Sequence, residues 1–196
     1  MADQPAAEGL DLAALRAWLD AQVPGELPGN LSASLITGGK SNLTYIVSNG
    51  ERDVIVRRPP LGHVLATAHD MGREHRIMAA LAGTTVPVPR MIALCSDDAV
   101  IGAPFYVMER VPGTAFRLAT DLEALGADRT RTITERLVDT LVDLHAGDRE
   151  GQHFGEQLDL RVCLRFAVTA NQDVVVARLG ERDDRRLAGL QRVLVG

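Results

Sequence analysis

A short glycine-containing segment stands out among the residues that could take part in chemistry. Gly38 and Gly39 are followed by Lys40, the only lysine of the chain, and then by Ser41 and Asn42. Adjacent glycines let backbone N–H groups approach an anion closely, and the next three side chains add a cation and hydrogen-bond donors. A simple hairpin bend explains the glycines equally well, because neither G-x-x-x-x-G-K-[ST] nor G-x-G-x-x-G is present. The segment alone leaves both interpretations open.

An arginine and a glutamate further along the chain could form an ion pair. In DVIVRR, alternation places Ile55 and Arg57 on one face of a strand and Arg58 on the other. Glu74 follows on a helical pattern, near an apolar stripe where a carboxylate needs a partner. An arginine on an adjacent strand could supply that partner. Taken singly, a surface arginine and a solvated helix glutamate are the ordinary alternatives.

The segment FYVMERVPG offers main-chain rather than side-chain chemistry. Its strand pattern ends near Pro112, because proline cannot continue a hydrogen-bonded ladder. A strand that leaves a sheet there exposes carbonyl and amide groups in alternation. The carbonyl of Glu109 and the amide of Val111 could therefore hydrogen-bond the edge of an adenine ring.

The rest of the pattern predicts the elements that would position these residues. Apolar periodicity and turn residues predict helices over 10–22, 64–81, 118–125 and 130–146, and strands over 31–37, 44–48, 53–57, 91–98 and 104–111. Five strands around one helix, followed by further helices, favour an α+β fold with two lobes over a doubly wound sheet.

Bulk composition limits the classes of function. The 196 residues carry a net charge of −5, which argues against a general nucleic-acid binder. Cys95 and Cys163 form no C-x-x-C pair, so we expect reduced thiols rather than a zinc site or a disulfide framework. The start of the chain, MADQPAAEG, lacks a secretory apolar region, and no apolar run approaches the ~18 residues of a membrane span. We therefore expect a cytoplasmic protein without nucleic-acid or membrane partners.

The order of these signals resembles the aminoglycoside phosphotransferase family, in particular its branch joined to acyl-CoA dehydrogenase domains. The similar blocks are LITGGKSNLTYIV, VIVRRPP, REHRIMAAL, VPVPRMIALC, PFYVMERVPG and LVDTLVDLHA. The resemblance implies a protein-kinase-like N-lobe over 29–113, with a five-stranded antiparallel sheet and one packed helix. A helix and linker over 1–28 would precede it, and an incomplete helical C-lobe would begin over 114–155.

The resemblance also implies an ATP site. Residues 38–42 would cover the phosphates, Arg57 would take the place of the family's phosphate-holding lysine, and Glu74 would be its ion-pair partner. Met108 would be the gatekeeper next to the adenine. The residues expected to bind the cofactor are Gly38, Gly39, Lys40, Ser41, Asn42, Ile55, Arg57, Glu74, Met108, Glu109 and Val111.

The family's catalytic motif has no match in this sequence. The family needs H-G-D-x-x-x-x-N, whose aspartate accepts the substrate proton and whose asparagine helps hold Mg²⁺, and then a second metal-binding aspartate. We therefore expect no catalytic or metal-binding residue here, and Mg²⁺ only with a complete C-lobe. Residues 156–196 alternate like a strand where helices are expected. This pattern predicts a divergent tail, either truncated or frame-shifted, and a diverged strand on the lobe is the alternative.

Two functions follow from these interpretations. The first is an ATP-dependent phosphotransferase (kinase) homologue, with the catalytic loop missing and this chain alone inactive. It would transfer the γ-phosphoryl group to a hydroxyl of a small molecule, either aminoglycoside-like or hydroxyacyl-CoA-like. The alternative is a non-catalytic nucleotide-binding or interaction module. A lobe without its partner would expose apolar cleft surface, so self-association is expected.

Overall fold

The computed structural model describes residues 8–36, 42–62, 70–114, 116 and 119–149. The elements follow in the order α1 (Leu12–Gln22), β1 (Ser32–Leu35), β2 (Leu43–Ser48), β3 (Asp53–Arg58), α2 (Met71–Leu81), β4 (Met91–Cys95), β5 (Phe105–Glu109), α3 (Ala119–Glu123) and α4 (Ala127–Arg149). This order confirms the predicted succession of helices and strands. The predicted tail over 156–196 lies outside the described residues.

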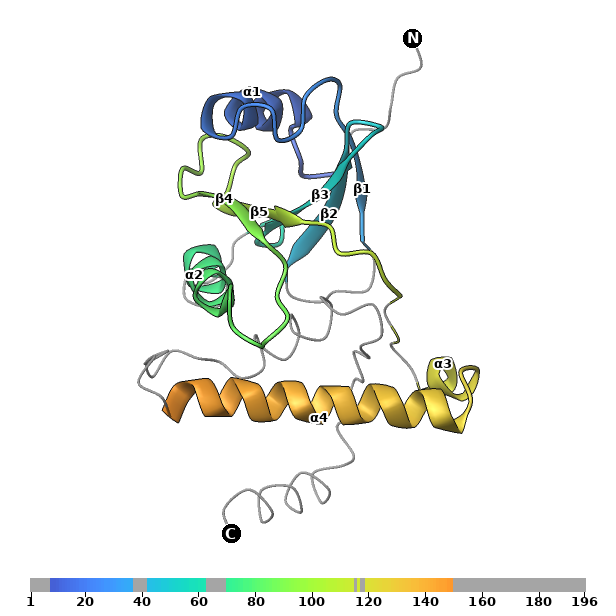
Figure 1. Ribbon diagram of the computed structural model, residues 1–196. Helices are drawn as coiled ribbons and strands as arrows, with labels where there is room; N and C mark the ends of the chain where they lie inside the picture. The colour runs from blue at the N-terminus through green and yellow to red at the C-terminus, as the bar shows by residue number, and fades with distance from the viewer. Residues whose placement is uncertain (1–7, 37–41, 63–69, 115, 117–118, 150–196) are drawn as a thin grey trace.

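All five strands belong to one antiparallel sheet with the strand order β1-β2-β3-β5-β4. Because α2 lies between β3 and β4 in the chain, β3 pairs with β5 rather than with the next strand. Figure 1 shows α1 on one side of the sheet and α2 on the other, with α4 running below them. The arrangement confirms the predicted α+β fold with a kinase-like sheet.

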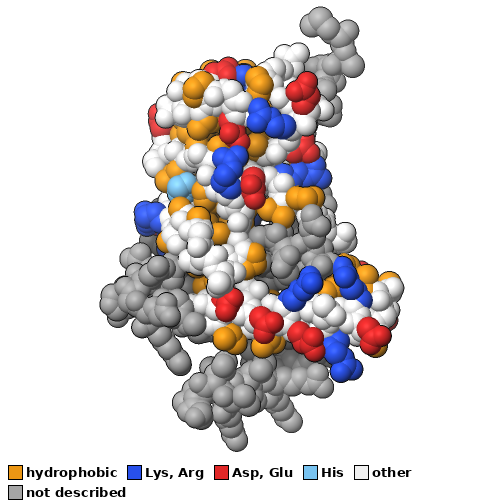
Figure 2. Space-filling view, viewed as in Figure 1, with side chains coloured by type: hydrophobic (Ala, Val, Ile, Leu, Met, Phe, Trp, Pro, Cys, Tyr) orange, Lys and Arg blue, Asp and Glu red, His pale blue; other side chains and the backbone are white. Residues whose placement is uncertain are grey.

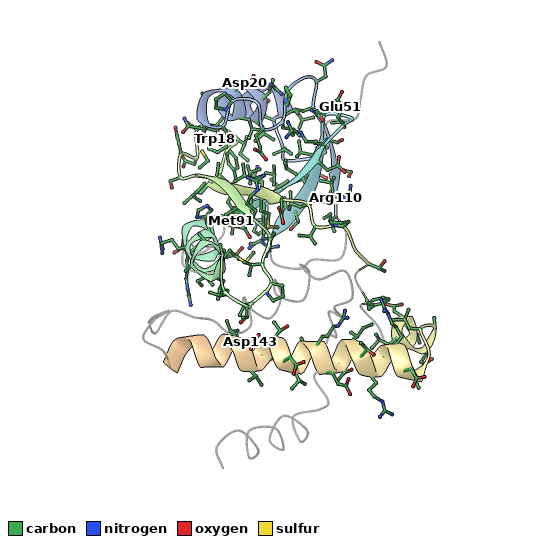
Figure 3. The ribbon with its side chains drawn as sticks, in the orientation of Figure 1. Trp18, Asp20, Glu51, Met91, Arg110 and Asp143 are labelled. Carbon is green, nitrogen blue, oxygen red and sulfur yellow. The ribbon has the colours of Figure 1, made fainter. Side chains whose placement is uncertain are left out.

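Strand alternation divides the core of the sheet into two parts. Val54 and Val56 of β3 belong to the apolar cluster beneath α1, whereas Ile55 between them belongs to the cluster beneath α2. On the α1 side, the ring of Trp18 contacts Phe105 edge to face, with ring centroids 4.8 Å apart. Figure 3 shows side chains filling both spaces, with Trp18 between α1 and the sheet. The central strands β3 and β5 are therefore buried on both faces, so charged side chains on them need partners.

Helix α2 begins at Met71, later than the predicted start at residue 64. The side chain of Asp70 caps the helix, because its carboxylate accepts a hydrogen bond of 2.8 Å from the backbone N–H of Arg73. Residues 63–69 lie outside the described part of the chain. The predicted apolar face is confirmed, since the buried residues of the helix are Met71, Ile77, Met78 and Leu81.

Helix α4 is longer than the predicted range of 130–146 and packs beside α2. Its Leu144 belongs to a small apolar cluster with Ile77, Leu81 and Val86. Figure 2 shows acidic side chains following one another along α4. In the sequence of this helix, Glu135, Asp139 and Asp143 are four residues apart and therefore share one face. Among the described helices, none is long and apolar enough to cross a membrane.

Candidate functional site

Three residues on neighbouring strands form a row that faces α2. Thr44 of β2 lies directly opposite Arg57 of β3, and Arg57 lies directly opposite Tyr106 of β5. Directly opposed residues of antiparallel strands project from the same face of a sheet. Arg57 therefore stands between a threonine and a tyrosine, on the face that the first turn of α2 covers.

The carboxylate of Glu74, from that first turn, is the centre of the site. Its Oε2 accepts hydrogen bonds from Arg57 Nε at 3.0 Å and from the Tyr106 hydroxyl at 2.9 Å. Its Oε1 accepts from the side-chain amide of Asn42 at 3.0 Å. A terminal nitrogen of Arg57 also donates to Thr44 Oγ1 at 3.0 Å. The predicted ion pair between Arg57 and Glu74 is thus present and is held by neighbours from β2 and β5.

Because the network is buried, its hydrogen bonds are strong, and breaking them lowers the unfolding free energy considerably. The side chains of Arg57 and Glu74 are each 13% exposed, and Tyr106 is fully buried. Burial raises the pKa of the Tyr106 hydroxyl well above its usual value of 10, while Arg57 lowers it and Glu74 raises it further. The hydroxyl therefore remains a proton donor to Glu74. Removing one member of such a pair leaves a buried charge with fewer partners, which is strongly unfavourable.

The two tyrosines of the chain offer a matched test of this network. Tyr106→Phe removes a donor to a carboxylate, so we expect a loss of about 1.5–3 kcal/mol in unfolding free energy. Tyr45→Phe removes a 2.6 Å hydrogen bond to a neutral acceptor, the carbonyl of Glu8, and we expect a loss of about 1 kcal/mol. Urea denaturation of both variants measures the difference. An equal or larger loss for Tyr45→Phe would contradict the importance of the Glu74 network.

Three further residues of the expected ATP site lie on the side of the sheet that α2 covers. Ile55 lies opposite Met108 in the β3–β5 ladder, and both are buried in the cluster beneath α2. Asn42 is also buried, with its amide on Glu74. The remaining residues of the glycine segment, 38–41, lie outside the described part of the chain, so their proposed phosphate contacts stay predictions.

The end of β5, which was expected to meet adenine, is held by contacts with the segments before β4 and at the start of β3. Glu109 is the last residue of β5, and its backbone N–H donates to the carbonyl of Arg90 at 2.9 Å. The next residue, Arg110, forms an ion pair with Asp53 at the start of β3. Hydrogen bonds from Ser48 and Arg110 lower the pKa of the Asp53 carboxyl, which favours the charged pair. Val111 follows as a half-buried residue, and its adenine contact stays a prediction.

Arg58 faces away from the site, as alternation predicted, but it is not a surface residue. Its side chain is buried, and one terminal nitrogen donates to the carbonyl of Gly9 and, at 2.9 Å, to the carbonyl of Ile101. Arg58 therefore joins the segment before α1 to the segment before β5. Its pKa is lowered by burial, yet an arginine stays charged under these conditions.

Sequence reasoning missed Thr44 and Tyr106 as parts of the network. A signal for Tyr106 was available, because Tyr106 and Met108 are two residues apart and therefore share one face of β5. Thr44 carried no comparable signal, since its contact depends on how β2 aligns with β3.

Cysteine and metal chemistry receive no support from the described residues. Cys95 is a buried free thiol, and burial raises its pKa. Cys163 lies beyond the described part of the chain. Within the described ranges, no group of three or more His, Cys, Asp or Glu side chains is arranged to hold a metal ion.

The sequence profile of the phosphotransferase enzyme family matches residues 32–194. This range contains the complete sheet, helices α2 to α4 and nearly all of the segment 156–196 that we expected to diverge. The match therefore covers the larger part of the chain, including every residue of the Glu74 network.

Individual relatives agree with the family match. Mouse acyl-CoA dehydrogenase family member 10 is 38% identical over 124 residues, which cover 62% of this chain and 12% of that protein. Human acyl-CoA dehydrogenase family member 11 is 36% identical over 139 residues, which cover 69% of this chain and 18% of that protein. The chain thus spans less than a fifth of the length of these relatives.

A solved structure is similar over most of the chain. It is the crystal structure of a Ralstonia eutropha protein assigned as a candidate aminoglycoside phosphotransferase. The two chains are 32% identical with a TM-score of 0.59, and the similarity covers 75% of this chain and 41% of that one. The chain has a kinase-like sheet, the ion pair between Arg57 and Glu74, and a match to the family's sequence profile over residues 32–194. It therefore belongs to the phosphotransferase enzyme family.

Proposed function

We propose that this chain is the nucleotide-binding part of an ATP-dependent phosphotransferase, which transfers the γ-phosphoryl group to a hydroxyl of a small molecule. The observation that carries the proposal is the ion pair between Arg57 on the third strand and Glu74 on the next helix. In the kinase-like N-lobe the residue at the Arg57 position holds the phosphates of ATP, and the helix glutamate fixes its position.

The residues around the pair suit a nucleotide in their chemistry. An arginine presents a planar set of N–H donors that matches phosphate oxygens. Glu74 and Thr44 hold the guanidinium in a fixed orientation, so little side-chain entropy is lost when phosphate binds. The glycine segment at 38–41 would add backbone N–H donors, and the end of β5 near Glu109 and Val111 would meet the adenine.

These residues would bind and orient ATP without completing its chemistry. Phosphoryl transfer also needs a group that positions the acceptor hydroxyl, together with Mg²⁺ held near the β- and γ-phosphates to neutralise developing charge. The family's motif for these roles is not found in the sequence. We therefore expect this chain alone to bind ATP without turnover, and we expect Mg²⁺ to be held only with a complete C-lobe.

The acceptor is proposed as a small hydroxylated molecule of one of two classes. The similarity to acyl-CoA dehydrogenase family members 10 and 11 supports a hydroxyacyl-CoA-like acceptor. The similarity to the Ralstonia structure supports an aminoglycoside-like one. Both acceptors and ATP are compatible with the proposed cytoplasmic location.

Displacement of a fluorescent ATP analogue from the purified chain tests the proposal. ATP and ADP should compete in the micromolar to millimolar range, and adenosine should compete more weakly because it lacks the phosphates that Arg57 would bind. Mass spectrometry of mixtures with ATP and either a 3-hydroxyacyl-CoA or kanamycin should detect no phosphorylated product from this chain alone. Failure of millimolar ATP to compete would contradict the nucleotide site.

The same assays, repeated on a fusion protein, separate the alternative from the leading proposal. A binding module without a catalytic role would bind ATP in this chain and would still transfer no phosphate when a complete family C-lobe is fused after residue 155. Transfer by the fused protein would favour the phosphotransferase.

A further inference from the structure

Asn42 contacts Glu74 from a different direction than the other residues of the network. It lies immediately before β2, whereas Arg57 and Tyr106 lie on the central strands β3 and β5. The residue is only 8% exposed, and its side-chain amide nitrogen lies 3.0 Å from Glu74 Oε1. The resemblance implied that this residue covers phosphates, yet its amide is directed at a carboxylate of the protein.

The contacts on Glu74 are divided between its two oxygens. Arg57 and Tyr106 both donate to Oε2, and Asn42 donates to Oε1. Donors at both oxygens restrict rotation of the carboxylate group about its last side-chain bond. The orientation of the carboxylate in turn fixes the guanidinium of Arg57, which also donates to the hydroxyl of Thr44. Asn42 therefore acts on Arg57 through Glu74.

We propose that Asn42 is a positioning residue that joins the start of β2 to α2 and keeps Glu74 oriented for its pair with Arg57. This role deepens the proposed function, because it assumes that Arg57 binds phosphate. Phosphoryl-transfer proteins depend mainly on such positioning, and small displacements of a binding group cost much of its effect. Asn42 itself would not touch the nucleotide.

The choice of asparagine fits this role. The group facing Glu74 Oε1 must be a donor, and the side-chain amide supplies N–H groups without a competing negative charge. Aspartate of the same size would place two carboxylates about 3 Å apart, where both cannot remain ionised. The contact with Glu74 thus favours an amide over its closest isostere, the carboxylate of aspartate.

A double-mutant cycle on ATP affinity separates positioning from direct phosphate contact. Asn42→Ala should weaken ATP binding about tenfold in the otherwise native chain. In the Glu74→Ala background the same substitution should change the dissociation constant about twofold or less, because the residue through which Asn42 acts is gone. An equal loss in both backgrounds would overturn the proposal and assign Asn42 to the phosphates.

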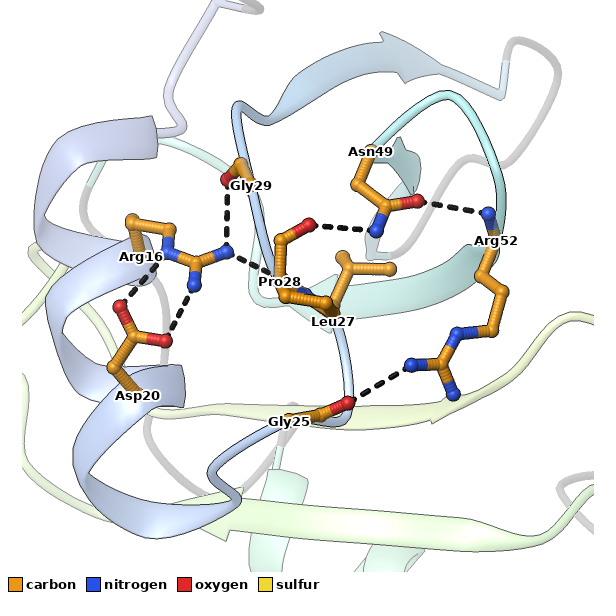
Figure 4. A network of polar contacts seen from close by, with 8 residues as sticks. All are labelled: Arg16, Asp20, Gly25, Leu27, Pro28, Gly29, Asn49 and Arg52. Carbon is orange, nitrogen blue, oxygen red and sulfur yellow. Dashed lines mark hydrogen bonds and ion pairs between the residues drawn. The ribbon is translucent and has the colours of Figure 1, made fainter.

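Asn49 provides a matched control at the opposite end of β2. Its amide donates to the carbonyl of Pro28 at 2.6 Å, far along the chain from Glu74, and Figure 4 shows this contact. Asn49→Ala should leave the dissociation constant of ATP within about twofold of the native value. A tenfold loss from Asn49→Ala would mean that the effect of Asn42 is general to β2 and would also overturn the proposal.

Hydrogen exchange tests, in the absence of nucleotide, whether Asn42 connects the start of β2 to α2. In Asn42→Ala, backbone amides at the start of α2 and at the start of β2 should both exchange faster than in the native chain, and Asn49→Ala should leave α2 unchanged. Unchanged exchange of α2 in Asn42→Ala would overturn the proposal even where Glu74→Ala does not fold. If the native chain fails to bind ATP, the proposed function fails, and this measurement still decides whether Asn42 holds Glu74.

Discussion

Replacing Arg57 with alanine is expected to weaken ATP binding about ten- to a hundredfold, roughly the value of one charge-assisted hydrogen bond. The substitution removes the cation proposed to meet the phosphates. It also leaves Glu74 as a negative charge near them, although Tyr106 and Asn42 still donate to its oxygens. Displacement of a fluorescent ATP analogue measures the change in the dissociation constant.

Two other arginine substitutions make this result specific. Arg57→Lys keeps the charge but loses the planar geometry that reaches both Glu74 and Thr44, so we expect a loss of ATP affinity that is smaller than that of Arg57→Ala. Arg52 lies in the turn between β2 and β3, and its side chain donates an exposed hydrogen bond of 2.8 Å to the carbonyl of Gly25, as Figure 4 shows. Arg52→Ala should leave ATP affinity unchanged. Equal losses from Arg57→Ala and Arg52→Ala would contradict the assignment of Arg57.

Arg58→Met is expected to lower the unfolding free energy by about 2–3 kcal/mol while leaving the ATP affinity of the folded protein nearly unchanged. The buried guanidinium donates to two main-chain carbonyls, of Gly9 and Ile101, from segments far apart in the sequence. Without it, both carbonyls lose a donor, and a buried carbonyl without a partner is costly. Urea denaturation followed by circular dichroism measures the loss.

The control for this prediction is again an exposed arginine. Arg52→Met removes a single donor at the surface, and we expect a change within about 0.5 kcal/mol. A comparably small change for Arg58→Met would show that the buried contacts of Arg58 contribute little. A large loss of ATP affinity in folded Arg58→Met would show that the two faces of β3 are coupled.

Much of the sheet and the ion pair between Arg57 and Glu74 could be predicted from the sequence, because they depend on local periodicity. Alternation in β3 assigns Arg57 and Arg58 to opposite faces, and a 3.6-residue period assigns Glu74 to the buried side of α2. The pairing of Arg57 with Glu74 then requires only that α2 pack on the sheet near β3. These features follow from neighbouring residues, so one sequence is sufficient to expect them.

The remaining half of the network depends on contacts between distant segments. Tyr106 reaches Glu74 because β5 inserts beside β3 in one alignment, and a shift of one residue would turn it to the other face. The carbonyls that bind Arg58 belong to irregular segments before α1 and before β5, which have no periodic pattern. Asn42 was singled out for its place beside two glycines, but only the folded chain brings its amide to Glu74.

Trp18, which packs against Phe105, is an intrinsic fluorescent probe that reports on one region of the protein. Since the chain contains one tryptophan, its emission reports on the interface between α1 and the sheet and is insensitive to α4. Among the described helices, α4 is the longest and contributes most to circular dichroism at helical wavelengths. The two signals follow different parts of one chain, so their coincidence or separation during denaturation indicates whether the sheet and α4 unfold as one cooperative unit.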